Sequence, residues 1–95
     1  MSKLSENEIK SKLEALGEGW EVNNNILTRV FPFKGYYKTI AFVNSVAWIA
    51  QQEKHHPDLE VSYNKCVVNF TTHDEGNTLT DLDFKSAQRI NDLNP

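Results

Sequence analysis

The feature that most constrains the fold is a long helical pattern over residues 37–53 that stops at a proline. Its apolar side chains form two adjacent stripes, with Ile40, Val43, Ala47 and Ala50 in the first and Phe42, Val46 and Ile49 in the second. Together the stripes are wider than the face that one sheet covers, which indicates burial on two sides, as at a subunit interface. The helix is expected to end near His55, because His56 precedes Pro57 and a residue before proline is disfavoured in the α conformation.

The N-terminal part of the chain predicts one helix and a pair of strands. Ser5 and Glu8 are spaced as a capping box, apolar residues follow at helical spacing, and Gly17 supplies a stop. Residues 19–33 predict two strands around a turn at 23–25, because asparagine tolerates the left-handed conformations of a tight hairpin.

The C-terminal part predicts a second pair of strands and a last helix. Residues 59–73 read as a strand, a turn at Asn64–Lys65 and a longer strand. Thr80 is placed as the N-cap of the last helix, with Asp83 at its third helical position. The order α-β-β-α-β-β-α is typical of an α+β fold in which helices cover one face of an antiparallel sheet. The uncovered face or edge of such a sheet favours an oligomer.

The composition describes a single folded domain, residues 1–95, and excludes several classes of partner. Hydrophobic residues at 39% fit a globular protein, and a formal charge of −3 offers no basic surface for direct nucleic-acid binding. No apolar run approaches membrane-spanning length, and residues 1–10 lack the apolar core of a signal peptide. We therefore expect a cytoplasmic protein with no membrane partner. Cys66 is the single cysteine, so we expect a buried, inert thiol and no internal disulfide.

Three roles are open for the histidines His55, His56 and His73. An adjacent pair in a loop is often solvated surface. Three imidazoles can also bind a catalytic metal, but adjacent side chains diverge, and the spacing matches no common pair of ligands on a helix. Acid–base catalysis is the third role, because histidine titrates nearest to neutral pH and a cluster can both donate and accept protons.

A set of short motifs in a fixed order helps to choose among these three roles. The motifs are His55-His56-Pro57, Tyr63-Asn64, Thr71-Thr72-His73-Asp74, and Leu79-Thr80 followed by Asp83 at the start of a helix. This order resembles the pterin-4a-carbinolamine dehydratase family, whose animal members also act as dimerisation cofactors of a homeodomain transcription factor. The resemblance extends over nearly the whole chain, including the Gly-Trp before the first strand and the Phe-Pro-Phe before the long helix.

The resemblance implies a sheet of four antiparallel strands with helices on one face, assembled as a homodimer or homotetramer. It implies a hydro-lyase that dehydrates 4a-hydroxytetrahydrobiopterin to quinonoid dihydropterin and water, without a metal or a bound cofactor. This reaction recycles the pterin of aromatic amino-acid hydroxylases, to which a functional link is expected. The alternative is an interaction module of the same fold, which would bind a helical partner through Phe42, Val46 and Ile49.

The motif positions also imply the site residues. His55 and His73 would transfer protons at the leaving hydroxyl and at N5, and His56 would mainly position the substrate. The substrate-binding set implied by the motifs is His55, His56, Pro57, Thr72, His73, Asp74 and Glu75, in which the backbone around 72–75 holds the edge of the pterin ring.

The chain departs from the family's pattern at three points. Gln51 stands four positions before the first histidine, where an acidic residue is common, and Glu53 is the carboxylate nearby. Leu82 replaces a residue that is often basic, and the loop over 74–80 is one residue longer than usual. Two roles are open for Asp83, because a carboxylate at the third helical position either caps the helix or supports catalysis.

Overall fold

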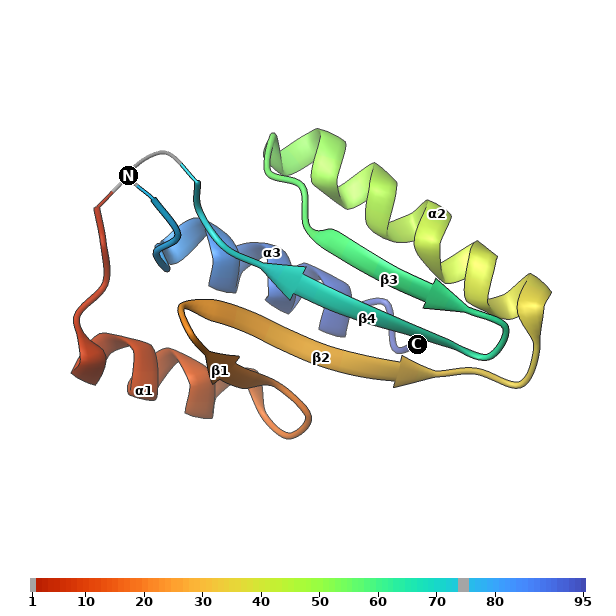
Figure 1. Ribbon diagram of the computed structural model, residues 1–95, viewed down its shortest axis with the longest axis horizontal. Coiled ribbons are helices and arrows are strands. Elements are labelled where there is room, and N and C mark those ends of the chain that lie inside the picture. Colours follow the sequence, from red (N-terminus) through yellow and green to blue (C-terminus); the bar gives the residue numbers. More distant parts are fainter. Residues whose placement is uncertain (1, 74–75) are drawn as a thin grey trace.

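Two antiparallel hairpins join into one four-stranded sheet in the computed structural model, which describes residues 2–73 and 76–95 (Figure 1). The strands are β1 (Glu21–Asn23), β2 (Ile26–Pro32), β3 (Asp58–Ser62) and β4 (Lys65–Phe70), and the helices are α1 (Glu6–Leu16), α2 (Tyr36–Glu53) and α3 (Asp81–Asn91). The sheet order is β1-β2-β4-β3, so the hairpins meet along β2 and β4. The predicted order of elements and the antiparallel sheet are confirmed.

Local signals explain how the N-terminal elements begin and end. The predicted capping box is present at α1, where Ser5 and Glu8 each accept a hydrogen bond from the other's backbone N–H. Asn24 and Asn25 have φ angles of 51° and 63°. These left-handed conformations suit the tight turn between β1 and β2, so the predicted hairpin is also confirmed.

The second hairpin turns one residue earlier than the sequence predicts. Ser62 pairs with Lys65, so the loop consists of Tyr63 and Asn64, whereas the prediction was Asn64–Lys65. The backbone N–H of Phe33 donates to the carbonyl of Asn64 at 2.7 Å, which ties this turn to the end of β2. The position of the turn is thus set by pairing between strands, which a local pattern does not specify.

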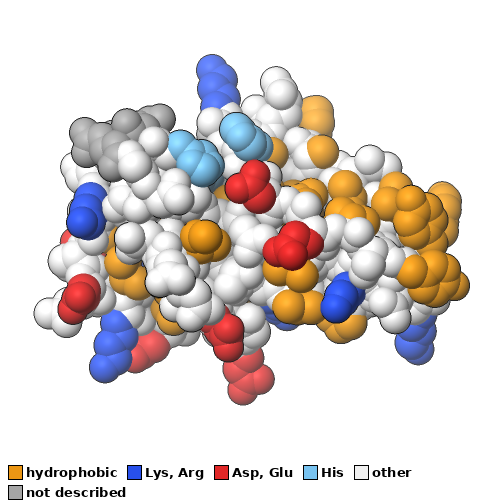
Figure 2. Space-filling view, viewed as in Figure 1, with side chains coloured by type: hydrophobic (Ala, Val, Ile, Leu, Met, Phe, Trp, Pro, Cys, Tyr) orange, Lys and Arg blue, Asp and Glu red, His pale blue; other side chains and the backbone are white. Residues whose placement is uncertain are grey.

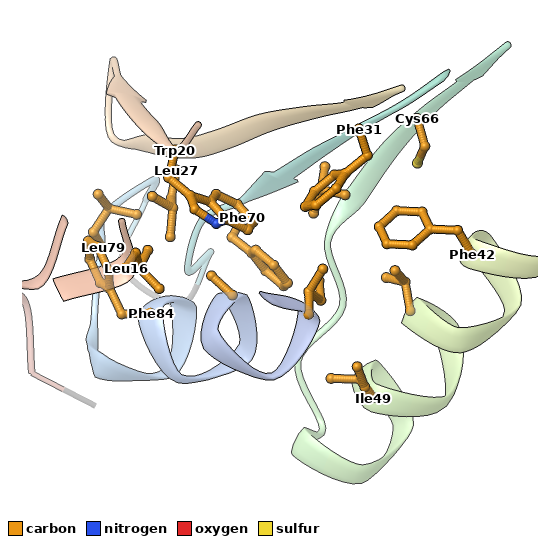
Figure 3. Close-up of a cluster of buried hydrophobic side chains, with 14 of the residues drawn as sticks. Leu16, Trp20, Leu27, Phe31, Phe42, Ile49, Cys66, Phe70, Leu79 and Phe84 are labelled. Carbon is orange, nitrogen blue, oxygen red and sulfur yellow. The ribbon is translucent and has the colours of Figure 1, made fainter. Parts of the chain in front are cut away.

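One apolar core lies between the sheet and the helices (Figure 3). The buried apolar residues of the two central strands are Leu27, Phe31, Cys66, Val68 and Phe70, which alternate along each strand as the period of two requires. Figure 3 shows α2 and α3 beneath the same face of the sheet. Burial raises the pKa of the Cys66 thiol, as expected for a cysteine within a core.

The alternative docking face predicted on α2 is wrong. Phe42, Val46 and Ile49 are at most 5% exposed and pack into the core, so they present no surface to a helical partner. The helical period correctly places them on one face but does not indicate what covers that face. The other stripe is less covered, with Val43 half-buried and Ala47 exposed. Its burial at a subunit interface stays a prediction.

None of the helices in the described ranges, 2–73 and 76–95, has the length and apolar character needed to span a membrane.

Candidate active site

The C-terminal end of α2 places the two adjacent histidines. The helix ends at Glu53, and Lys54 adopts the left-handed conformation with φ 54° and ψ 38°. The Ala50 carbonyl accepts hydrogen bonds from the backbone N–H groups of Lys54 and His55, the latter at 3.1 Å. These bonds close the last turn. The predicted helix end is confirmed, and the chain continues through His56 and Pro57 into β3.

His55 is held on two sides. Its Nε2 atom lies 2.5 Å from Oδ1 of Asp83, and its side chain is only 11% exposed, whereas that of Asp83 is fully buried. The imidazole also stacks on the ring of Phe70, with 5.7 Å between centroids and 12° between planes. The carboxylate fixes which nitrogen carries a proton, and the aromatic ring restricts rotation, so the imidazole has a defined orientation.

Asp83 belongs at the same time to the cap of α3. Its Oδ2 atom accepts hydrogen bonds from the Thr80 backbone N–H at 3.0 Å and from the Thr72 hydroxyl at 2.8 Å. The predicted capping role is therefore confirmed. The other oxygen of the same carboxylate contacts His55. Both carboxylate oxygens of Asp83 therefore have partners, and the residue links α3 to His55.

A pocket of about 410 Å³ opens beside the helix exit. It is lined by Val46, Ala47, Ala50, Gln51, Lys54, His55, His56, Pro57 and Leu59. Apolar walls with a few polar groups are typical of sites for small organic ligands. A hollow of about 510 Å³ lies elsewhere, between α2 and α3 around Trp48, and contains none of the three histidines. We therefore take the smaller pocket at the helix exit as the candidate site, because His55 and His56 line it.

His56 and His73 are exposed, in contrast to His55. His73 Nδ1 lies 3.1 Å from Oδ1 of Asn77, and His73 is not among the residues that line the pocket. Histidine side chains, coloured pale blue, are visible on the face of the molecule in Figure 2. His73 directly follows Thr72, whose hydroxyl donates to Asp83, so the backbone joins His73 to the buried network.

The loop that carries His73 is closed at its base. Thr72 and Thr78 form an isolated antiparallel bridge, with N–H to carbonyl distances of 2.8 and 3.1 Å. The predicted substrate-binding residues Asp74 and Glu75 lie outside the described residues.

Of the two predicted supporting residues on α2, only Gln51 lines the pocket. Glu53 instead accepts a hydrogen bond from Arg89 at 2.9 Å and pairs with Lys85 at 3.3 Å, both on α3. The Arg89 guanidinium, followed by Lys85, holds the pKa of Glu53 below its usual value. Glu53 thus ties the end of α2 to α3 and does not face the ligand space.

Within residues 2–73 and 76–95, no three His, Cys, Asp or Glu side chains are grouped so as to hold a metal ion. The titratable groups at the histidines are arranged as a hydrogen-bonded pair with one acid and one base, suited to moving protons.

Several residues that contribute to the site have no predicted site role. Phe70 lies on a predicted strand, and Thr80 is predicted as the N-cap of the last helix. The walls formed by Ala47 and Ala50 were assigned to an apolar stripe. Two alanines spaced i, i+3 just before a helix exit are a usable signal, because small side chains leave room beside a loop.

Comparisons with known proteins identify the family of the chain. The model of the family described as pterin 4 alpha carbinolamine dehydratase matches residues 2–93. The chain therefore belongs to the pterin-4-alpha-carbinolamine dehydratase family, and its predicted resemblance is confirmed.

Relatives from distant organisms match almost the whole chain. Proteins named "putative pterin-4-alpha-carbinolamine dehydratase" include one from Legionella pneumophila, 51% identical over 95% of this chain and 80% of its own length. Another, from Sulfolobus acidocaldarius, is 45% identical over 96% of this chain and 98% of its own length. Family membership thus rests on similarity along the full domain, and supports a dehydratase role.

Solved structures show the same fold. The crystal structure of a transcriptional coactivator/pterin dehydratase from Brucella melitensis matches with a TM-score of 0.90 and 34% identity, covering 97% of this chain and 98% of its own. A pterin dehydratase-like protein identified as a RuBisCO assembly factor in the alpha-carboxysome matches with a TM-score of 0.68 and 18% identity, covering 82% and 92%. The second likeness shows the fold alone.

Proposed function

We propose that the protein dehydrates 4a-hydroxytetrahydrobiopterin to quinonoid dihydropterin and water by histidine acid–base catalysis. The observation that carries this proposal is His55, held between Asp83 and Phe70 at the wall of a pocket. Family membership supplies the substrate class. The surroundings of His55 supply a reason why this imidazole can act on that substrate.

In the proposed reaction the C4a–O bond breaks and its electron pair leaves with the oxygen. A protonated imidazole gives its proton to that oxygen, which departs as water. The electrons of the N5–H bond form the new N5–C4a double bond, and a second imidazole takes the proton. One acid and one base are therefore needed, each worth about 10²–10⁴-fold in rate.

His55 is proposed as the base. Asp83 accepts the proton on Nε2, so Nδ1 carries the lone pair of the neutral ring. When Nδ1 takes the proton from N5, the Asp83 carboxylate stabilises the positive charge that develops on the imidazole. Asp83 therefore acts through His55 and is a positioning residue.

His73 is proposed as the acid, and His56 as a residue that positions the substrate. Both imidazoles are exposed, so they exchange protons with water between turnovers. Pro57 closes the pocket beside His56, and the backbone of 72–75 holds the ring edge through its amide groups. Gln51 contributes a neutral polar group where the family's pattern has a carboxylate.

The wider context follows from the same proposal. The protein acts as a homodimer or homotetramer in the cytoplasm. Its product returns to the pterin pool used by an aromatic amino-acid hydroxylase. The coactivator function belongs to the Brucella protein by name, and the burial of Phe42, Val46 and Ile49 gives no support to the docking face considered for it here.

A direct assay tests the proposal. 4a-Hydroxytetrahydrobiopterin is generated enzymatically, and quinonoid dihydropterin is followed by its absorbance with and without the purified protein. His55→Ala is expected to lower kcat by about 10²–10⁴-fold. Gln88→Ala, an exposed change on the same helix as Asp83, serves as the control and should retain the wild-type rate. Equal rates for wild type and His55→Ala would refute the assignment.

A further inference from the structure

A row of buried hydroxyl and carboxylate groups leads away from His55. Thr72, Thr80 and Asp83 are all at most 6% exposed. Thr72 Oγ1 lies 2.8 Å from Asp83 Oδ2 and 3.0 Å from Thr80 Oγ1. The Leu82 backbone N–H donates to the Thr80 hydroxyl at 3.3 Å. The row thus runs from the first turn of α3 through the end of β4 to the imidazole.

The donors and acceptors in this row can be assigned by counting protons. A carboxylate accepts only, so the Thr72 hydroxyl uses its one proton on Asp83. Thr72 must then accept from Thr80, whose own hydroxyl accepts from the backbone. Every hydroxyl proton therefore points towards Asp83. Two donors reach Oδ2, from Thr72 and from the Thr80 backbone, which leaves Oδ1 for the proton on His55 Nε2.

We propose that Thr72 is a positioning residue whose hydroxyl occupies Asp83 Oδ2, so that Oδ1 faces His55 and holds the imidazole in the tautomer with its proton on Nε2. The inference rests on the proposed function, because it assigns Thr72 a part in the same reaction. It differs from a contact of the Thr72 backbone with substrate, since the hydroxyl faces Asp83 within the protein.

The chain offers a matched control for the Thr72 hydroxyl. Thr78 is the bridge partner of Thr72 and is also buried, but its hydroxyl has no hydrogen-bond partner among the described residues. Valine replaces threonine with nearly the same shape in either position. Thr72→Val removes a donor to Asp83, whereas Thr78→Val removes none, and both change the same small bridge.

The readout is the imidazole of His55, observed by ¹⁵N NMR of the full chain at about pH 8, above the ordinary range of histidine. We expect wild type to show a protonated Nε2 that exchanges slowly with water. Thr72→Val should give a mixture of tautomers and at least about tenfold faster exchange, whereas Thr72→Ser and Thr78→Val should resemble wild type. In the dehydratase assay, Thr72→Val should lower kcat about tenfold, with KM changed by less than about twofold.

A wild-type imidazole signature in folded Thr72→Val would overturn the proposal. If Thr72→Val and Thr72→Ala both fail to fold while Thr78→Val folds, the hydroxyl is needed for the structure itself, and the proposal is likewise overturned. The NMR result does not depend on activity. An inactive wild type with the predicted tautomer would refute the dehydratase function alone, and a normal kcat with an altered tautomer would refute the link between them.

Discussion

His55 and His73 are both proposed to transfer protons, yet they differ in how their side chains are fixed. His55 is 11% exposed, stacked on an aromatic ring and bonded to a buried carboxylate. His73 is exposed, and its one side-chain hydrogen bond among the described residues is to the amide of Asn77. The orientation of His55 is thus set by a buried carboxylate and an aromatic ring, whereas His73 has a hydrogen bond to an exposed amide.

This contrast matches two different requirements of the proposed reaction. A base that removes a proton from a ring nitrogen benefits from a fixed lone pair and a nearby negative charge. An acid that must be reloaded with a proton at each turnover benefits from contact with water. In the proposed reaction the same residue type would serve two roles, because His55 packs against the core and His73 lies in a loop.

Removal of the Asp83 charge should lower kcat more than a change at the partner of His73 or at Glu53. Asp83→Asn replaces an acceptor at His55 with an amide and weakens the cap of α3. We expect kcat to fall by about 10²-fold or more and the free energy of unfolding to fall by about 1 kcal/mol. Steady-state kinetics and urea unfolding measure the two effects. A wild-type kcat in the folded variant would show that His55 needs no carboxylate.

The corresponding change at His73 should have a much smaller effect. Asn77→Ala removes the partner of an exposed imidazole, and an exposed hydrogen bond contributes little because water replaces it. We expect kcat within about threefold of wild type, whereas His73→Ala should lower it by at least about tenfold. A loss in Asn77→Ala as large as that in Asp83→Asn would mean that both imidazoles are fixed by the protein.

The smallest effect on chemistry is expected at Glu53, which lies next to the helix exit but faces α3. Glu53→Gln should leave kcat within about twofold and change the dependence of stability on pH. The pKa of Glu53 is lowered in the folded state from its ordinary 4.5, so the unfolded chain binds more protons near and below that pH. The stabilisation is therefore complete above about pH 5.5 and is lost as pH falls through the lower, folded pKa.

Urea unfolding of wild type and Glu53→Gln over a range of pH measures this effect. The difference in unfolding free energy should be constant near neutral pH and should shrink in acid. A difference that grows in acid would contradict the assigned ion pairs with Arg89 and Lys85.

The sequence predicted the elements well because most of their signals are local. Both capping boxes, the asparagine turn and the proline after the histidines act within a few residues, and the structure confirms each of them. The turn after β3 was misplaced by one residue because strand pairing decides it.

The site was predicted only in part because its key contacts join distant segments. The capping role of Asp83 could be read from Thr80, three positions away, but its contact with His55 spans 28 residues and depends on how α3 packs. The helical period grouped Phe42, Val46 and Ile49 correctly, yet it could not indicate that the sheet covers them. Motif order, rather than local pattern, identified the histidines as a group.

A double-mutant cycle on His55 and Asp83 tests most directly whether the carboxylate acts through the imidazole. The rates of wild type, His55→Ala, Asp83→Asn and the double variant are compared in the dehydratase assay, with folding checked by circular dichroism. We predict that Asp83→Asn lowers kcat by about 10²-fold in the wild-type background and by less than about threefold once His55 is alanine. Equal losses in both backgrounds would show that Asp83 does not act through His55.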